Sequence, residues 1–380
     1  MNTDKLKVLH ITESRGWSGG AAQALFLACQ LREAGHQNII ACPSDGDLGR
    51  KAAAKGFEVV HFQPRRDYDL ATAFRLTGLI NSLRPDVLHA HHPKAHAMGL
   101  IAKFLARHKP VFIVTRRVSH PIVKTFFARL KYKSSLIDGF IAVAESVRGL
   151  LTAYGLPEDR VRTIYSGTDT SLFCPRPPDP DIKEELRLPA GLPVVMLIGN
   201  FSADKGQHVL LKAAKTLYRG GLDFALVFAG RGTDSPELRK LFSLEGLPQE
   251  KARFLGLRDD VEKLLSVASV SVNAAVKGEA LSGGIRESLA MGIAAVASDI
   301  SGNSEIVKDG VTGLLFPPGD AAALAGRVET LLKDASLRDG LTKRSVALVR
   351  DNFTVEVMGK RTLAYYRELL SAHSANTVEK

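Results

Sequence analysis

One stretch in the second half of the chain, residues 270–297, decides how the protein folds. It opens with Val270-Ser-Val-Asn273, continues through Gly278-Glu-Ala-Leu-Ser-Gly-Gly-Ile-Arg-Glu-Ser-Leu-Ala-Met-Gly292 and ends with Ala294-Ala-Val-Ala297. The first and last segments are short and apolar, as buried strands are, and the middle segment predicts a helix over Ile285–Met291 that stops at Gly292. A strand, a helix and a second strand in this order predict a parallel sheet.

The same alternation of strand-like and helix-like segments runs through almost the whole chain. Helical patterns lie between the strands, for example Ala21–Ala34 and Leu70–Leu83. Further strands are predicted at Val8–Thr12, Ile39–Cys42, Val59–Phe62, Val87–Ala90, Val111–Thr115, Phe140–Val143, Val194–Ile198 and Ala225–Phe228. Short β-branched strands separated by amphipathic helices predict an α/β protein with two doubly wound, Rossmann-like parallel sheets.

A Pro-rich break, Phe173-Cys-Pro-Arg-Pro-Pro-Asp-Pro180, separates the two sets of strands, and 380 residues are more than one core usually holds. We therefore expect an N-terminal domain over 1–174 and a C-terminal domain over 175–354. A final helix and tail, 355–380, is expected to pack back on the first domain. Because ligands of such sheets bind beyond the carboxyl ends of the strands, a site is expected in a cleft between the domains.

Composition narrows the classes of protein to consider. An apolar content of 45% and a charged content of 24% are ordinary for a globular protein, and no apolar run approaches the roughly 20 residues that span a bilayer. The first residues lack the apolar run of a signal peptide and lead straight into a strand. We expect a cytoplasmic protein.

The net charge of +11 is unevenly distributed. Val87–Ile137 contains ten Lys and Arg but no Asp or Glu, so this region attracts anions. Within it, Pro121–Lys133 looks like a helix with one apolar face surrounded by cations. Such a helix either lies on an anionic membrane, through residues 94–133, or packs its apolar face on the sheet. We expect no nucleic-acid partner.

Two carboxylates in the opening stretch stand at positions suited to chemistry. Glu279 is predicted on the loop after a strand, and Glu287 in the first turn of the following helix, facing solvent. Backbone N–H groups at that helix start, with glycines allowing close approach, suit a diphosphate. Glu287 is placed to accept hydrogen bonds from ribose hydroxyls and Glu279 to hold sugar hydroxyls.

Residues 198–319 resemble the donor-binding half of the family-4 glycosyltransferases, whose signature is E-x7-E. Glu279 and Glu287 match its spacing, and Ile293–Phe316, Phe254–Val261 and Val227–Gly232 match other family segments in the right order. The resemblance implies a GT-B fold, transfer with retention of configuration from a nucleotide diphosphate sugar, and neither a metal nor another cofactor.

The resemblance also implies roles for individual residues. Lys205 would contact the donor phosphates, as would Asn200, which stands where the family usually has Arg. Other donor contacts are carried over at Gly19, Gly20, Arg258, Ser282, Gly283 and Gly284. Lys205, Glu279 and Arg117 are expected to act in catalysis.

On the acceptor side, the His-rich strand end with His89 and His91 matches a family segment that lines the acceptor. The family histidine that contacts the donor sugar is replaced by Arg117, and either Arg117 or His120 is expected to take over its role. The acceptor is expected to be a glycan or lipid-linked glycan of the cell envelope, of the lipopolysaccharide type.

Three alternatives stay open at this point. A nucleotide-sugar 2-epimerase shares the fold but has no need of a basic acceptor surface. A nicotinamide oxidoreductase would carry G-x-G-x-x-G after its first strand, and neither half does. A non-catalytic nucleotide-sugar-binding protein could keep the fold and lose the chemistry, which the replacements at Asn200 and Arg117 would permit.

Overall fold

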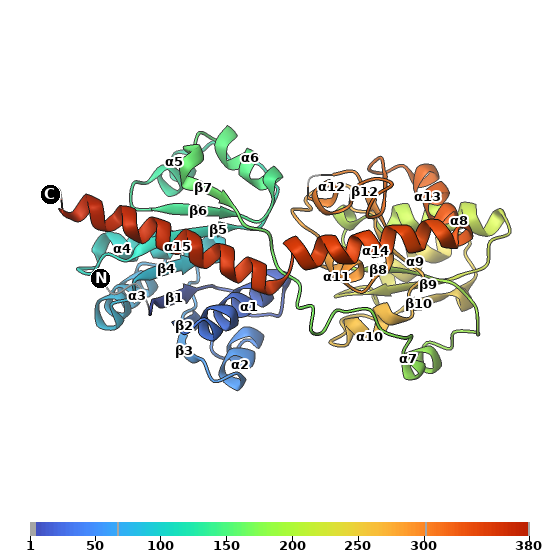
Figure 1. The fold of residues 1–380 in the computed structure, drawn as a ribbon, viewed down its shortest axis with the longest axis horizontal. Coiled ribbons are helices and arrows are strands. Elements are labelled where there is room, and N and C mark those ends of the chain that lie inside the picture. Colours follow the sequence, from blue (N-terminus) through green and yellow to red (C-terminus); the bar gives the residue numbers. More distant parts are fainter. Residues whose placement is uncertain (1–4, 67, 301, 379–380) are drawn as a thin grey trace. The chain divides into compact units, whose positions relative to one another are not determined.

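The computed structural model describes residues 5–66, 68–300 and 302–378, and the chain forms two compact units (Figure 1). The first unit comprises residues 1–167 together with 355–380, and the second comprises residues 168–354. The two Rossmann-like parallel sheets predicted from the sequence are both present. The units divide at Gly167, before the Pro-rich segment that was expected to separate them at 174.

The first unit is built on a seven-stranded parallel sheet in the order β3-β2-β1-β4-β5-β6-β7. Its strands are β1 (Lys7–Ile11), β2 (Gln37–Cys42), β3 (Glu58–His61), β4 (Val87–Ala90), β5 (Val111–Arg116), β6 (Gly139–Ala142) and β7 (Val161–Thr163). Its helices are α1 (Gly19–Glu33), α2 (Asp47–Ala54), α3 (Leu70–Leu83), α4 (Pro93–Leu105), α5 (Phe126–Lys133), α6 (Glu145–Ala153) and α15 (Val355–Val378).

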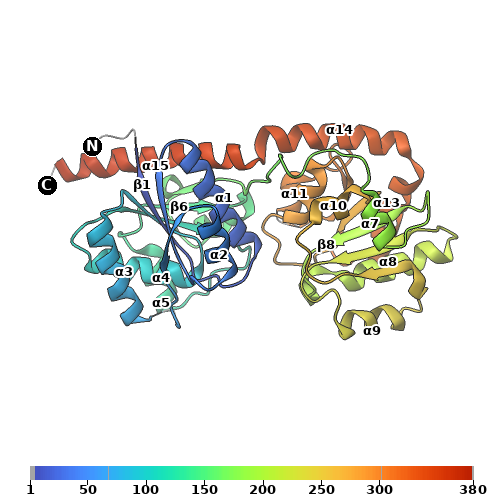
Figure 2. The same cartoon turned by 90° about the horizontal axis from the view of Figure 1, so that it is seen from below.

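Helices cover both faces of this sheet. Leu27 and Leu31 of α1 and Tyr365 and Tyr366 of α15 share one buried cluster with the strands, so the last helix belongs to the first unit as expected. Figure 2 shows α1 and α15 along one face of the sheet and α3 and α4 along the other. Burial on both faces explains why the central strands are continuous apolar runs.

The second unit has a six-stranded parallel sheet in the order β10-β9-β8-β11-β12-β13. Its strands are β8 (Val194–Ile198), β9 (Ala225–Ala229), β10 (Ala252–Phe254), β11 (Val270–Asn273), β12 (Ala294–Ser298) and β13 (Leu314–Phe316). Its helices are α7 (Pro180–Glu185), α8 (Gln207–Arg219), α9 (Pro236–Leu244), α10 (Val261–Ser266), α11 (Gly283–Ala290), α12 (Asn303–Ile306), α13 (Ala321–Lys333) and α14 (Ala335–Asn352).

Two buried clusters, one on each face, hold the second unit together. Residues of α8, α9 and α13 pack on one face, and residues of α7 and α10 pack on the other. Strand order reverses between β8 and β11, so their carboxyl ends form the switch point at which such sheets bind ligands. None of the helices in the described part of the chain is both long and apolar enough to cross a bilayer.

Candidate active site

The loop from β8 to α8 is held against the end of β11. It passes through a short 3-10 turn, Ala203–Lys205, and then Gly206 adopts a left-handed conformation with φ of 70°. A side chain at Gly206 would meet the main-chain oxygen of Ala274, since an ideal Cβ there would lie 1.7 Å from it. Glycine therefore allows the close approach that brings Lys205 to the carboxyl end of β11.

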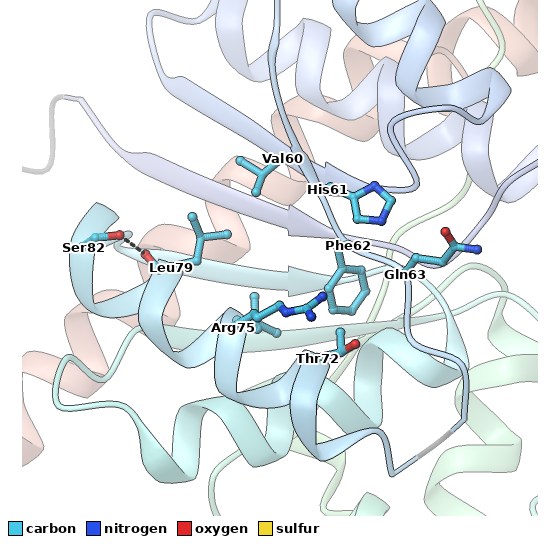
Figure 3. Close-up of a pocket in the computed structure, with 9 residues that line it drawn as sticks. Val60, His61, Phe62, Gln63, Thr72, Arg75, Leu79 and Ser82 are labelled. Carbon is cyan, nitrogen blue, oxygen red and sulfur yellow. Dashed lines mark hydrogen bonds between the residues drawn. The ribbon is translucent and has the colours of Figure 1, made fainter.

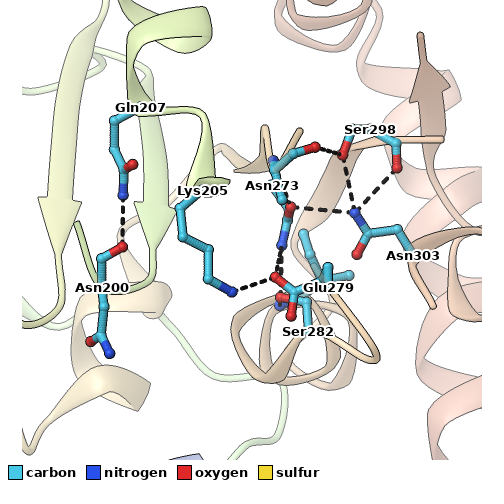
Figure 4. Close-up of polar contacts among 10 residues, drawn as sticks. Asn200, Lys205, Gln207, Asn273, Glu279, Ser282, Ser298 and Asn303 are labelled. Atoms are coloured by element: carbon cyan, nitrogen blue, oxygen red, sulfur yellow. Dashed lines mark hydrogen bonds and ion pairs between the residues drawn. The ribbon is translucent and has the colours of Figure 1, made fainter. Parts of the chain in front are cut away.

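Lys205 and Glu279 meet in an ion pair, with the ammonium 2.5 Å from Oε2 (Figure 4). Glu279 is buried, while Lys205 stays partly exposed. Asn273, the last residue of β11, donates from Nδ2 to Ser282 Oγ at 2.8 Å and to Glu279 Oε2 at 3.4 Å. Two of the residues predicted to act together are thus adjacent, although 74 positions separate them in the chain.

Buried hydrogen bonds hold the side chain of Asn273 in place. Its Oδ1 accepts hydrogen bonds from the backbone N–H of Ala275 at 3.0 Å and from Asn303 Nδ2 at 3.3 Å. Asn303 Nδ2 also donates to the carbonyl and the hydroxyl oxygens of Ser298 (Figure 4). Asn273 and Asn303 fix the position of Ser282 and Glu279, and the sequence analysis identified neither. The one sequence feature that could have pointed to Asn273 is its place at the end of a predicted strand.

The N-terminus of α11 lies beside this cluster. Ser282 is its N-cap, and its hydroxyl accepts a hydrogen bond from Ile285 N. Gly283 and Gly284 open the helix, and an ideal Cβ at Gly284 would lie 2.8 Å from the main-chain oxygen of Ile198, at the end of β8. First-turn N–H groups of a helix have no partner within it and attract anions. The predicted anion site at Ser282–Gly284 therefore has the geometry that it needs.

Glu287 lies in the second turn of α11 and is half-buried, where the sequence analysis placed it in the first turn and facing solvent. Burial raises the pKa of its carboxyl, the Arg286 guanidinium opposes the shift, and Glu262 adds to it. Arg286 is itself buried, and burial lowers its pKa to about 10. The helix begins at Gly283, two residues before the predicted start at Ile285, and this earlier start places Glu287 in the second turn.

Asn200 and Arg258 are held by other protein groups. Asn200 Oδ1 accepts a hydrogen bond from Arg231 N at 3.1 Å, and its main-chain oxygen accepts one from Gln207 Nε2 at 3.0 Å. Arg258 pairs with the carboxylates of Glu185 and Asp260, at 2.5 and 2.7 Å. These two carboxylates raise the pKa of the guanidinium. Arg258 therefore braces α7 against the loop before α10, and its predicted contact with a donor stays a prediction.

In the first unit, the glycine-rich start of α1 contacts residues that follow two other strands. Gly19 faces open space, whereas an ideal Cβ at Gly20 would lie 2.8 Å from His92 Nε2 and 3.4 Å from Arg117 Cδ. Arg117 Nη1 donates to Ser166 Oγ at 3.3 Å, and His92 is hydrogen bonded to Thr12 Oγ1 at 2.6 Å. The structure thus brings together Gly20 and Arg117, two residues that the resemblance singled out separately, and their predicted contacts with a donor stay predictions.

His92 is a further functional candidate, because it lies beside Gly20. Burial lowers the pKa of its imidazole, the Glu13 carboxylate opposes this shift, and Arg117 adds to it. Glu13 in turn accepts hydrogen bonds from the N–H groups of Lys94 and Ala95 and so caps α4. His120, by contrast, is exposed, and its main-chain oxygen accepts a hydrogen bond from Arg116. Of the two histidines, His92 is the one beside Arg117.

His89 and His91 lie in the interior of the first unit. Hydrogen bonds of 2.6 Å join His89 to Tyr366 of α15 and to Thr115, and one of 3.0 Å joins His91 to His10. Burial lowers the pKa of all three histidines. Because their side chains are enclosed by protein, we assign His89 and His91 to the core rather than to the acceptor surface.

The same three histidines have the spacing of a metal site, since one nitrogen from each lies within 4.8 Å of the others. Five of their six ring nitrogens already have a hydrogen-bond partner, Asn38 among them. The remaining one, His91 Nδ1, has none among the described residues. A metal would have to displace several of these bonds, so the group fits a hydrogen-bonded core better than a metal centre.

A pocket of about 400 Å³ lies between the edge strand β3 and helix α3 (Figure 3). His61, Gln63 and Arg75 line it with polar groups, and Phe62 and Leu79 line it with apolar ones. Concave surfaces that combine apolar and a few polar groups are where proteins bind small molecules. No residue of this pocket was predicted as functional from the sequence.

Comparison with known proteins places this geometry in context. A family model described as Glycosyltransferase Family 4 matches residues 17–172, and one described as Glycosyl transferases group 1 matches residues 192–334. The chain is 28% identical to the lipopolysaccharide core biosynthesis glycosyltransferase LpsE of Rhizobium meliloti over 368 residues, which cover 96% of this chain and 99% of the relative.

Two solved structures are similar over almost their full length. A glycosyltransferase from Rickettsia africae ESF-5 superposes with a TM-score of 0.87 at 22% identity, covering 97% of this chain and 99% of the other. Anabaena HepE, solved in complex with UDP and glucose, superposes with a TM-score of 0.82 at 21% identity, covering 95% and 99%. These likenesses confirm the predicted fold class.

Proposed function

The chain belongs to the family-4 glycosyltransferases and has their GT-B fold, and from this premise we propose that it is a retaining, metal-independent enzyme. Its donor is a nucleotide diphosphate sugar and its acceptor a glycan or lipid-linked glycan. HepE, which shares the fold, has been solved with UDP and with glucose, and this supports a uridine diphosphate donor.

One observation carries the proposal, which is the meeting of Lys205, Glu279 and the start of α11 in one place. Lys205 neutralises the diphosphate that leaves, and the first-turn N–H groups of α11 bind its oxygens. Glu279 accepts hydrogen bonds from the hydroxyls of the sugar, while Lys205 and Asn273 hold the carboxylate of Glu279 in place. The positive charge that a divalent metal would supply elsewhere comes from these protein groups.

The chemical step follows from this arrangement. The bond between the anomeric carbon and the diphosphate oxygen breaks as the acceptor oxygen bonds to that carbon on the same face. The acceptor proton passes to an oxygen of the departing diphosphate. The protein supplies position and charge rather than a proton-transfer group.

The acceptor and the place of action are proposed from charge and from one relative. LpsE acts in lipopolysaccharide core biosynthesis, and it aligns with nearly the whole of this chain. The stretch Val87–Ile137 carries only positive charge, which suits a phosphorylated or lipid-linked acceptor. We propose a role in the cell envelope, at the cytoplasmic face of a membrane to which the protein binds peripherally.

We expect transfer to persist in a chelator. The protein is incubated with UDP-glucose, an α-linked donor, and a deacylated lipopolysaccharide core as acceptor, with and without EDTA, and both released UDP and the anomeric proton of the product are followed by NMR. UDP release is expected to be equal within about twofold with and without EDTA, because Lys205 and α11 already neutralise the diphosphate. The product is expected to carry the α anomer.

A strict requirement for magnesium or manganese would show that the metal-independent step is wrong. A β-linked product would exclude retention. If free glucose or an isomerised donor formed without any transfer, the function would be that of a hydrolase or an epimerase.

A second expected result concerns Glu287. Glu287→Gln is expected to weaken UDP binding by about 10- to 100-fold, since a charged hydrogen bond contributes roughly 1.5–3 kcal/mol. Burial raises the pKa of this carboxyl in the folded state, so its ionised form at pH 7 opposes folding. The free energy of unfolding of the variant is therefore expected to stay equal or to rise slightly, and calorimetry with UDP together with urea unfolding measures both quantities.

Glu262→Gln serves as the control, because Glu262 is also buried and influences Glu287. It should leave UDP affinity within about twofold of the wild type. Unchanged UDP affinity in Glu287→Gln would refute the assignment of this residue to the ribose.

A further inference from the structure

Helix α5 leaves its apolar side chains exposed. No residue of this helix is buried, and Phe126 and Phe127 expose 75% and 60% of their surface. Val123 and Leu130 are exposed as well. The helix begins only at Phe126, with Thr125 as its N-cap, so it is shorter than the helix expected over Pro121–Lys133. Packing of this apolar face on the sheet, the plainer of the two readings of the sequence, is wrong.

The exposed apolar surface continues beyond α5. The ring of Tyr68 lies 5.6 Å from that of Phe127, centroid to centroid, and Tyr68 is itself exposed. Leu70 and Phe74 at the start of α3 are also exposed. Single exposed apolar residues are ordinary on a protein surface, but several together mark a site of contact.

Cations surround these side chains. Lys124, Arg129 and Lys133 are exposed, and together with Phe126 and Tyr154 they line a pocket of about 550 Å³ beside α5. Lys133 lies 5.6 Å from the centre of the Tyr154 ring. Among the described residues, neither Lys124 nor Arg129 forms an ion pair through its side chain. Three cations around one pocket make it suited to a phosphate group.

We propose that this surface, which we call the α5 surface (Val123, Lys124, Phe126, Phe127, Arg129, Leu130 and Lys133), docks the protein on an anionic phospholipid bilayer. The aromatic and aliphatic side chains enter the acyl boundary, and the pocket takes the phosphate of an acidic headgroup. This inference deepens the proposed function by identifying the membrane contact.

Charge complementarity selects the bilayer as the partner. The sequence around α5, residues 87–137, contains no carboxylate and ten Lys and Arg, so its charge is of the one sign that complements a layer of anionic headgroups. Apolar side chains ringed by cations are the pattern of helices that lie in the headgroup region of acidic membranes. Each Lys or Arg near such a membrane strengthens binding by a term that salt screens.

The test is sedimentation of the full chain with vesicles of phosphatidylglycerol and phosphatidylcholine. Binding is expected to require phosphatidylglycerol and to fall steeply between 50 and about 500 mM salt. Changing Lys124, Arg129 and Lys133 together to Ser should weaken binding about 100-fold, since each charge contributes about fivefold. Phe126→Ser with Phe127→Ser should weaken it at least tenfold, an order-of-magnitude figure for two aromatic groups withdrawn from the interface.

A matched control separates this surface from the net charge of the protein. Lys212, Lys240 and Lys263 are exposed lysines of the second unit, and changing all three to Ser removes the same charge. This control should keep vesicle binding within about threefold of the wild type. An equal loss in the control, equal binding to pure phosphatidylcholine, or no binding to acidic vesicles would each overturn the proposal.

Affinity for UDP distinguishes this inference from the proposed function. None of the substituted residues belongs to the donor site, so UDP binding by calorimetry should be unchanged in all three variants and also reports that they are folded. Vesicle binding without transferase activity would leave the docking surface standing and refute the enzyme. Transferase activity without vesicle binding would support the enzyme and refute the docking surface.

Discussion

Lys205→Met is expected to lower kcat by about 100- to 1000-fold, the usual cost of removing one group that stabilises charge developing in a transition state. The ammonium of Lys205 lies 2.5 Å from Glu279 Oε2 and stays partly exposed, so it can reach a diphosphate while remaining anchored. The diphosphate gains negative charge as the sugar leaves, so this contact is stronger in the transition state than with the bound donor. The apparent KM for the donor should therefore change less than kcat.

Two further variants show whether the loss comes from catalysis. Lys215→Met removes a lysine of α8 that pairs with Glu245 at the C-terminal end of α9, and it should keep kcat within about twofold. Lys205→Met combined with Glu279→Gln removes both charges of the pair. If this double variant regained most of the activity, the effect of Lys205→Met would come from the stranded carboxylate and the catalytic role of Lys205 would be wrong.

Periodicity was enough to predict most of the fold. Strand β4 and helix α3 have the bounds that the sequence predicted, because buried parallel strands are unbroken apolar runs and α3 repeats its apolar residues once per turn. Strands β7, β10 and β13 were missed. Each has only three residues, which is too short for any period to appear, and each is an edge strand of its sheet.

Residues of the candidate site could be predicted only where they belong to a recognisable sequence motif. Glu279 and Lys205 were found through family resemblance, and the structure brings them into contact. Asn273 and Asn303 could not be found, because their role depends on a hydrogen bond between the end of β11 and the start of α12, 30 positions apart in the chain. His89 shows the opposite error, since a histidine at a strand end looks the same in the sequence whether it faces solvent or, as here, a buried tyrosine.

Exposure was the property that the sequence predicted least well. The apolar residues around Phe126 fit a helix packed on the sheet as well as one on a membrane, and periodicity gives the same pattern for both. Only the structure distinguishes them, by leaving Phe126 exposed. The same holds for Glu287, whose half-buried position depends on where α11 begins.

The largest effect on stability is expected at a buried ion pair far from the donor site. Lys103 Nζ lies 2.5 Å from Asp138 Oδ2, and their side chains are only 4% and 20% exposed. The same carboxylate oxygen accepts a hydrogen bond of 2.6 Å from the backbone N–H of Phe112. Burial lowers the pKa of Lys103, and Asp138 opposes that shift. Asp138 therefore ties α4 to β5 and also keeps the buried lysine charged.

Asp138→Ala is expected to reduce the free energy of unfolding by about 3–5 kcal/mol, because it leaves Lys103 buried without a counter-ion and Phe112 N–H without an acceptor. Without Asp138 the pKa of Lys103 falls further below its unfolded value, so the unfolded state binds the proton more tightly. The loss should then shrink as pH rises toward the ordinary lysine range. Urea unfolding followed by circular dichroism measures these differences.

Asp45→Ala, which breaks the exposed pair with Arg15, is the matched control and should cost less than about 1 kcal/mol. Lys103→Met combined with Asp138→Asn should recover part of the stability, and equal losses in Asp138→Ala and Asp45→Ala would show that the buried pair is not what stabilises this unit.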